Sequence, residues 1–166
     1  MMDITPIMIK MIKEAHGHHH DINHFMKVHS FARTIGLKEN LPQELQDTLE
    51  LAAIVHDIAC PLCREKYGNT LGKYQEQEGM ILTRTFLEEF ALPEEMVERI
   101  VYLVGHHHTL NQIDGIDYQI LIEADYLVNA DESQYPIQAI QNMYDQVFKT
   151  ATGKQLLEYI YLKKDI

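Results

Sequence analysis

The chain has 166 residues and a formal net charge of −11, with 46 % hydrophobic and 23 % charged residues. This composition predicts one folded domain, residues 1–166, and excludes collagen-like, low-complexity and disordered chains. A domain of this length buries enough apolar surface to fold without a disulfide or a structural metal. The acidic balance also disfavours a nucleic-acid duplex as a partner.

Cellular location is predicted from what the sequence lacks. No apolar stretch is long enough to span a membrane, and the segment Met1–Pro6 has no features of a secretion signal. Cys60 and Cys63 form an isolated Cys-Pro-Leu-Cys, which we expect to hold reduced thiols. These features predict a cytoplasmic protein that does not bind membranes, and they leave the oligomeric state open.

Apolar residues with the helical period predict the secondary structure in chain order. Three helices are expected first, running from Thr5 to Gly17, from Asp21 to Gly36 and from Pro42 to Pro61. Residues 61–74 lack this period and contain Pro and Gly, so a long loop is predicted there. Further helices are expected near residues 76–90, 94–107, 117–131, 136–148 and 152–163. The predicted fold class is therefore all-α, a single compact bundle of about seven or eight helices.

Four polar side chains stand in apolar sequence. His56 and Asp57 follow Leu-Ala-Ala-Ile-Val, Asp125 lies within the apolar run of a predicted helix, and His24 belongs to the second predicted helix. Burial of such groups is costly unless they are paired or bound to a cation. Each of them singly is explained as a core polar residue with partners. As a set, two imidazoles and two carboxylates suit a divalent transition metal, and they predict a metal site.

The order of these residues resembles the HD-domain superfamily of metal-dependent phosphohydrolases, in which a separated His, a His-Asp pair and a later Asp lie on successive helices. The resemblance assigns the first position to His24 rather than His29, the pair to His56 and Asp57, and the last position to Asp125. It implies an all-α fold and one divalent ion, which would be Mn, Fe, Co, Ni or Zn, with Mg as another choice.

The motif-bearing core spans about residues 20–131. Within it, His106 and His107 resemble the further histidines of two-metal members of the superfamily, and one of them is a candidate ligand or substrate contact. The alternative is a solvated helix end, where imidazoles interact well with the helix dipole. Gln75 stands where the two-metal members have a histidine, which favours one metal.

The segment after the His-Asp pair is partly basic. The residues that we predict to bind phosphate are Arg64, Lys66, Lys73 and Gln75, and the catalytic candidates are Asp57 and Lys73. The same cations would also simply solubilise a loop. Cys60 occupies the neighbourhood where some nucleotidases of the superfamily place an acid-base Glu, so the proton-transfer residue is not assigned.

The resemblance implies hydrolysis of a nucleotide or another small phosphate ester by a metal-activated water. A catalytically weak module that binds metal and nucleotide for regulation is the alternative, because Cys60 and Gln75 depart from the superfamily pattern. A purely structural helical domain would leave Asp125 without a cation in an apolar helix. The expected partner is a small phosphorylated molecule.

Overall fold

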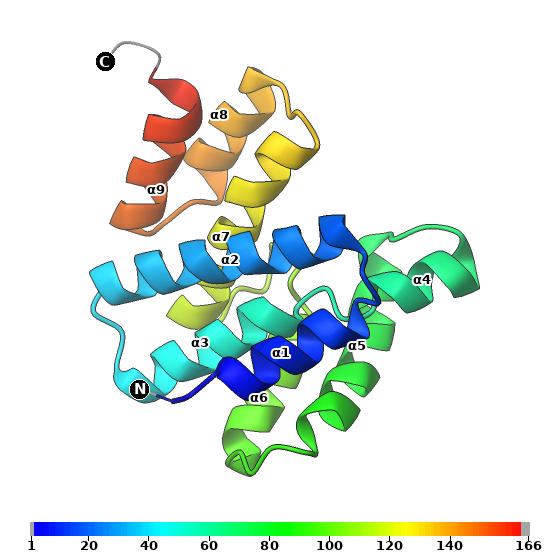
Figure 1. The fold of residues 1–166 in the computed structure, drawn as a ribbon. Helices are drawn as coiled ribbons and strands as arrows, with labels where there is room; N and C mark the ends of the chain where they lie inside the picture. Colours follow the sequence, from blue (N-terminus) through cyan, green and yellow to red (C-terminus); the bar gives the residue numbers. More distant parts are fainter. Residues whose placement is uncertain (1, 164–166) are drawn as a thin grey trace.

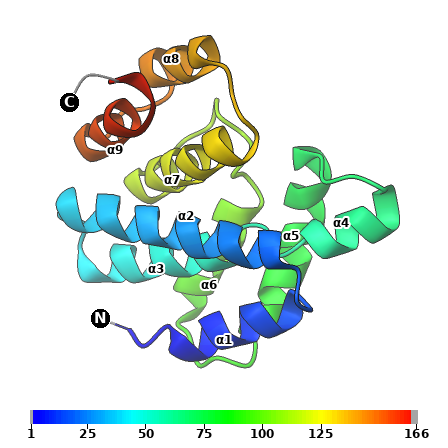
Figure 2. The ribbon, with the colours of Figure 1, turned by 45° about the horizontal axis from the view of Figure 1, so that its top comes forward.

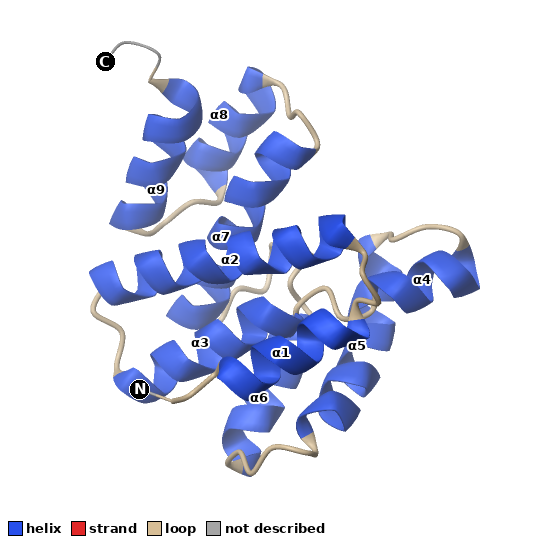
Figure 3. Ribbon diagram, in the orientation of Figure 1, coloured by secondary structure: helices blue, strands red, loops and turns tan. Residues whose placement is uncertain are grey.

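The computed structural model describes residues 2–163, and within them every regular element is helical (Figures 1 and 3). The elements are α1 (Thr5–Glu14), α2 (His19–Lys38), α3 (Gln43–Val55), α4 (Cys60–Tyr67), α5 (Gly72–Leu87), α6 (Glu94–Val104), α7 (Ile116–Glu132), α8 (Ile137–Gln146), α9 (Ala151–Leu157) and the π-helical turn η1 (Glu158–Leu162). The all-α prediction is confirmed, with one helix, α4, that the sequence pattern did not indicate.

The centre of the molecule is built from α2, α3 and α7. In Figure 2, α7 lies between the α8–α9 pair and α2, and α1, α5 and α6 lie beyond α3. The residues from Gln46 to Val55 in α3 and from Asp117 to Asp125 in α7 are all buried. Helices that are covered on all sides form the interior of a domain. His56 and Asp57 directly follow α3, and Asp125 lies within α7, so all three are carried into the interior.

All five prolines lie at helix starts, where a missing backbone N–H removes no helical hydrogen bond. Pro42, Pro93 and Pro136 are N-cap residues, and Pro6 and Pro61 lie in the first turns of α1 and α4. The prediction that residues 61–74 form a loop was therefore wrong except at residues 68–71. Pro61 lies in the first turn of α4, which runs to Tyr67, and α5 begins at Gly72.

The third predicted helix is shorter than expected. It ends at Val55 rather than at Pro61, and turn hydrogen bonds from Ile58 N to Val55 O and from Cys60 N to Asp57 O join it to α4. The His-Asp pair consequently lies in a tight turn between two helices. This turn lets the two neighbouring side chains face the same centre, which adjacent positions on a regular helix do not do.

The second helix begins earlier and ends later than predicted. The ring of His18 accepts a hydrogen bond from the backbone N–H of Asp21, so α2 starts at His19. The helix continues past Gly36 because this glycine serves packing rather than termination. A Cβ atom there would lie 2.2 Å from Oε1 of Gln46 on α3, so only glycine permits this close approach.

None of the helices in the described part of the chain is long and apolar enough to cross a membrane.

Candidate metal centre

The four predicted metal ligands meet at one point between α2, α7 and the turn after α3. Nε2 of His24 lies 3.1 Å from Nε2 of His56, 3.1 Å from Oδ1 of Asp125 and 3.3 Å from Oδ2 of Asp57. Nε2 of His56 lies 3.4 Å from the same oxygen of Asp125. These residues are separated by up to 101 positions in the chain, so the tertiary fold alone brings them together.

The centre is buried on all but one side. His24, His56 and Asp125 are 4 %, 0 % and 8 % exposed, whereas the side chain of Asp57 is 21 % exposed. Two imidazole nitrogens that face each other at 3.1 Å cannot both carry a hydrogen. They need a shared proton or a cation between them. Asp57 lies where an incoming molecule first meets the centre.

The charges of the centre stabilise one another. Burial opposes the positive charge of His24, but its bond to Asp125 and the negative charges of Asp57 and Asp125 outweigh burial and raise the pKa of the ring to about 10. Burial also opposes the charges of both carboxylates. The neighbouring imidazoles nevertheless hold the pKa values of Asp57 and Asp125 below their ordinary range, so both remain ionised. Without a metal, the centre is thus electrostatically anionic and attracts cations.

The far ring nitrogens are all occupied by acceptors. Nδ1 of His24 lies 2.7 Å from Oε2 of Glu132, and Nδ1 of His56 lies 2.9 Å from the carbonyl oxygen of Ala53. An acceptor at Nδ1 keeps the hydrogen on that nitrogen and leaves Nε2 free to ligate a metal. The geometry around both rings is therefore that of metal-ligating histidines.

His106 and His107 take different directions at the end of α6. His107 is 2 % exposed, its Nδ1 bonds to the carbonyl of Val104, and its Nε2 lies 3.4 Å from Oδ1 of Asp57. His106 instead bonds through Nδ1 to the carbonyl of Tyr102 and stacks on that ring. Of the two candidates, His107 is the one that the structure brings to the centre.

The donor set fits a divalent metal. His24, His56 and Asp57 each offer a ligand atom within 4.8 Å of the others, and a second such group consists of Asp57, His107 and His108. Within the described residues, Nε2 of His107 is buried without a hydrogen-bond partner, which is costly unless a cation or water binds it. Asp57 is common to both groups. The choice of one metal rather than two stays a prediction.

The residues predicted to bind phosphate lie on α4 and at the start of α5. Arg64 forms an ion pair with Asp21, and Nζ of Lys66 lies 2.7 Å from Oε1 of Glu78. Lys73 is exposed, and its Nζ lies 4.7 Å from the centre of the Tyr74 ring.

Gln75 is buried, and its Nε2 donates to the carbonyl of Thr70 while its Oε1 has no hydrogen-bond partner among the described residues. The start of α5 lies close to the histidines that follow α6. A Cβ atom on Gly72 would lie only 2.8 Å from the His108 ring. Phosphate binding by the four predicted residues stays a prediction.

Sequence reasoning missed two residues of α7 that support the centre. Nδ2 of Asn129 donates to Oδ1 of Asp125 over 2.8 Å, and Glu132 bonds to His24. The spacings of four and seven residues after Asp125 place both side chains on the same face of α7 as the aspartate. That spacing is the sequence signal that identifies them once Asp125 is taken as a ligand.

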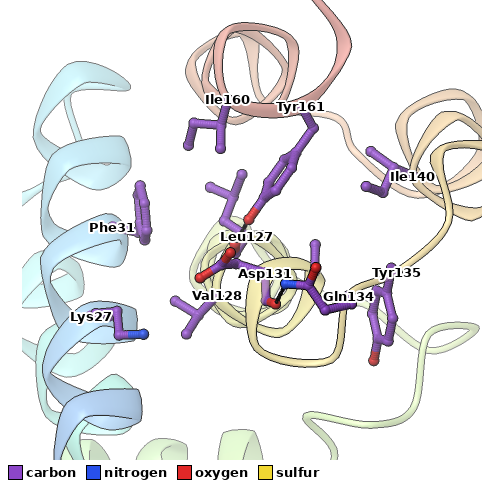
Figure 4. Close-up of a pocket in the computed structure, with 11 residues that line it drawn as sticks. Lys27, Phe31, Leu127, Val128, Asp131, Gln134, Tyr135, Ile140, Ile160 and Tyr161 are labelled. Carbon is purple, nitrogen blue, oxygen red and sulfur yellow. Dashed lines mark hydrogen bonds between the residues drawn. The ribbon is translucent and has the colours of Figure 1, made fainter.

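The centre is distinct from a cavity of about 540 Å³ between α2, α7 and the C-terminal turn (Figure 4). The ring of Tyr161 and the side chain of Ile160 cover it from the C-terminal side, and Lys27 lies at its α2 edge. None of the four predicted metal ligands lines this cavity. The metal centre instead opens to solvent through the exposed side of Asp57.

Comparison with known proteins identifies the family. The sequence model of the HD domain matches residues 21–134, more than half of the chain. This chain belongs to the HD-domain family. The matched segment contains all four predicted metal ligands and also Glu132. The HD-domain family is part of the superfamily of metal-dependent phosphohydrolases. Neither the search of curated proteins nor that of solved structures returned a match.

Proposed function

We propose that this HD-domain protein is a metal-dependent phosphohydrolase that cleaves a small phosphate ester, with a nucleotide as the first substrate to test. The main support for this proposal is that four side chains converge at one buried point with one open side. They are His24, His56, Asp57 and Asp125. The family supplies the reaction class, and the donor geometry supports it in this chain.

These four residues would hold the ion, which is a divalent transition metal (Mn, Fe, Co, Ni or Zn) or Mg. When bound, it supplies positive charge to a phosphate oxygen and lowers the pKa of a water molecule. The residues of the chain do the rest. Asp57 faces the open side, so a phosphate that enters would meet this side chain first, and the buried His107 contacts Asp57 from the turn after α6.

The basic residues of α4 and α5 would bind and orient the substrate. Phosphoryl transfer depends mostly on positioning and on positive charge around the equatorial oxygens. Lys73 is exposed and follows Gly72, which packs against His108, so its ammonium group is the cation that can turn toward a substrate phosphate. Arg64 and Lys66 would first have to exchange Asp21 and Glu78 for the substrate.

A regulatory module that binds metal and nucleotide with little turnover is the second candidate. It is favoured by Cys60, which is 5 % exposed and stands near the position of an acid-base Glu in some relatives. Burial, together with the negative charge of Asp57, raises the pKa of this thiol far above neutrality. Cys60 therefore does not exchange a proton readily during turnover.

Metal analysis of the purified protein followed by a phosphate-release screen separates these candidates. The screen uses nucleoside monophosphates, dinucleoside polyphosphates and sugar phosphates with added Mn, Co, Mg or Ni. Release that needs the metal and disappears in Asp57→Ala supports the hydrolase. Saturable nucleotide binding without release from any compound leaves the regulatory module, and a protein that binds no divalent metal contradicts both.

A further inference from the structure

One histidine of the centre differs from the others in its outer partner. Nδ1 of His56 and Nδ1 of His107 bond to the backbone carbonyls of Ala53 and Val104, which belong to the helices that lead to them. Nδ1 of His24 bonds to a carboxylate, that of Glu132, which lies 108 residues away on another helix. A carboxylate is a stronger and charged acceptor, so it orients the ring and increases the basicity of its other nitrogen.

Glu132 is itself held in place by a cation. Its Oε2 faces His24, and its Oε1 accepts from Nζ of Lys27 over 2.9 Å. Nε2 of His20 lies 3.5 Å from Oε2. The carboxylate is only 10 % exposed, whereas the side chain of Lys27 is 46 % exposed at the edge of the cavity in Figure 4. One carboxylate oxygen of Glu132 thus accepts from a histidine of the metal centre, and the other accepts from a lysine at the surface.

We propose that Glu132, held by Lys27, is a positioning residue for the metal. By accepting the Nδ1 hydrogen of His24, it keeps Nε2 of that ring directed at His56, Asp57 and Asp125. The inference rests on the metal site of the proposed function. It adds a charged residue, outside the four-residue motif, on which the metal affinity depends.

A merely structural role for the pair would be to join α2 to α7. These helices, however, already pack extensively along their length. An ion pair with a half-exposed lysine adds little to stability in such a place. A metal-positioning role predicts that changes at Glu132 alter metal affinity far more than they alter the stability of the metal-free protein.

The first experiment measures Mn²⁺ affinity by calorimetry for the wild type, Glu132→Gln and Lys27→Gln. We expect Glu132→Gln to weaken Mn²⁺ binding about 10–100-fold, the usual effect of losing an outer-shell partner, and Lys27→Gln to weaken it less. The matched control is Glu158→Gln. Glu158 also accepts from a lysine and a second donor, Lys163 and Tyr144, but it lies near the C-terminus. Its substitution should leave Mn²⁺ affinity within about twofold.

The second experiment repeats the measurement in a His24→Ala background. If Glu132 acts through His24, Glu132→Gln should have almost no further effect there, because effects that pass through one residue are not additive.

The outcomes separate this inference from the proposed function. Mn²⁺ affinity in Glu132→Gln that equals the wild type, or a loss of the same size with and without His24, overturns the positioning role even if the protein is a hydrolase. A clear loss through His24 in a protein that releases no phosphate supports the positioning role and contradicts the hydrolase. A wild type that binds no Mn²⁺ overturns both.

Discussion

Two histidines of α2, His24 and His29, each bond to a glutamate whose side chain is at most 10 % exposed. Their comparison shows what distinguishes a metal centre from a structural network. His29 bonds through Nε2 to Oε2 of Glu50 over 3.0 Å, on the side of α2 that faces α3. Glu50 also accepts from Arg33 at 2.8 Å and from Gln46 at 2.7 Å. Donors reach both oxygens of its carboxylate, so the acceptors of Glu50 are satisfied, and we call this group the closed network.

The network around His24 has the opposite balance. On its outer side the ring bonds to Glu132, but its inner nitrogen faces another imidazole nitrogen and two carboxylates, those of Asp57 and Asp125. Lone-pair atoms converge there without enough donors among the described residues. Buried polar groups occur in both regions, so burial alone does not mark a metal site. A metal site is marked instead by an excess of acceptor atoms that point at one another.

The largest effect is expected from removing a ligand of the network around His24. Asp125→Ala should weaken Mn²⁺ binding by more than about 100-fold, beyond the 10–100-fold typical of outer-shell residues, and should abolish metal-dependent phosphate release. Calorimetry and the release assay measure these effects. If Asp125→Ala binds Mn²⁺ as tightly as the wild type, the metal does not bind between His24, His56 and Asp125.

The closed network should respond in the reverse way. Glu50→Gln removes the buried carboxylate charge that His29 and Arg33 contact, and we expect the free energy of unfolding to fall by about 2–4 kcal/mol. Because Glu50 does not face the centre, Mn²⁺ affinity should stay within about twofold. Urea unfolding of the metal-free protein and calorimetry test both statements. Loss of Mn²⁺ binding in folded Glu50→Gln would contradict the separation of the two networks.

The pH dependence of stability sharpens the same comparison. Burial opposes the charge of Glu50, but its bonds with His29, Gln46 and Arg33 outweigh burial and lower its pKa from the ordinary 4.5 to about 2. A lowered folded-state pKa contributes stability that is complete above pH 4.5 and is lost as the pH falls from 4.5 to 2.

We therefore expect the stability difference between the wild type and Glu50→Gln to shrink by up to about 3 kcal/mol across this window. Urea unfolding at several pH values between 6 and 2 measures it. A difference that stays constant down to pH 2 would show that the Glu50 pKa is not lowered.

The smallest effect is expected at Lys73, which belongs to neither network. Lys73→Ala should leave Mn²⁺ affinity within about twofold and lower kcat/KM about 3–10-fold. The change falls on KM if the lysine binds substrate and transition state equally, and on kcat if it acts only in the transition state. Steady-state kinetics of the metal-loaded protein decide between them. Unchanged kinetics would leave Lys73 as a residue that only solubilises the surface.

The sequence by itself determined the all-α fold and selected the four donors of the centre. Both inferences depend on local properties: the helical period is a feature of neighbouring residues, and the cost of burying His56, Asp57 or Asp125 can be judged from the apolar residues around each of them. The same local reasoning failed at residues 61–74. Pro61 permits both an end and a start of a helix, and the pattern alone did not reveal the second role.

Only the tertiary structure decided the relations between distant segments. It selected His107 over His106, because the turn after α6 directs one ring to Asp57 and stacks the other on Tyr102. It joined Glu132 to His24 across 108 residues and gave His29 a different glutamate. Helical periodicity sets which face of a helix is apolar, but the packing of α2 between α3 and α7 sets which polar side chains meet there.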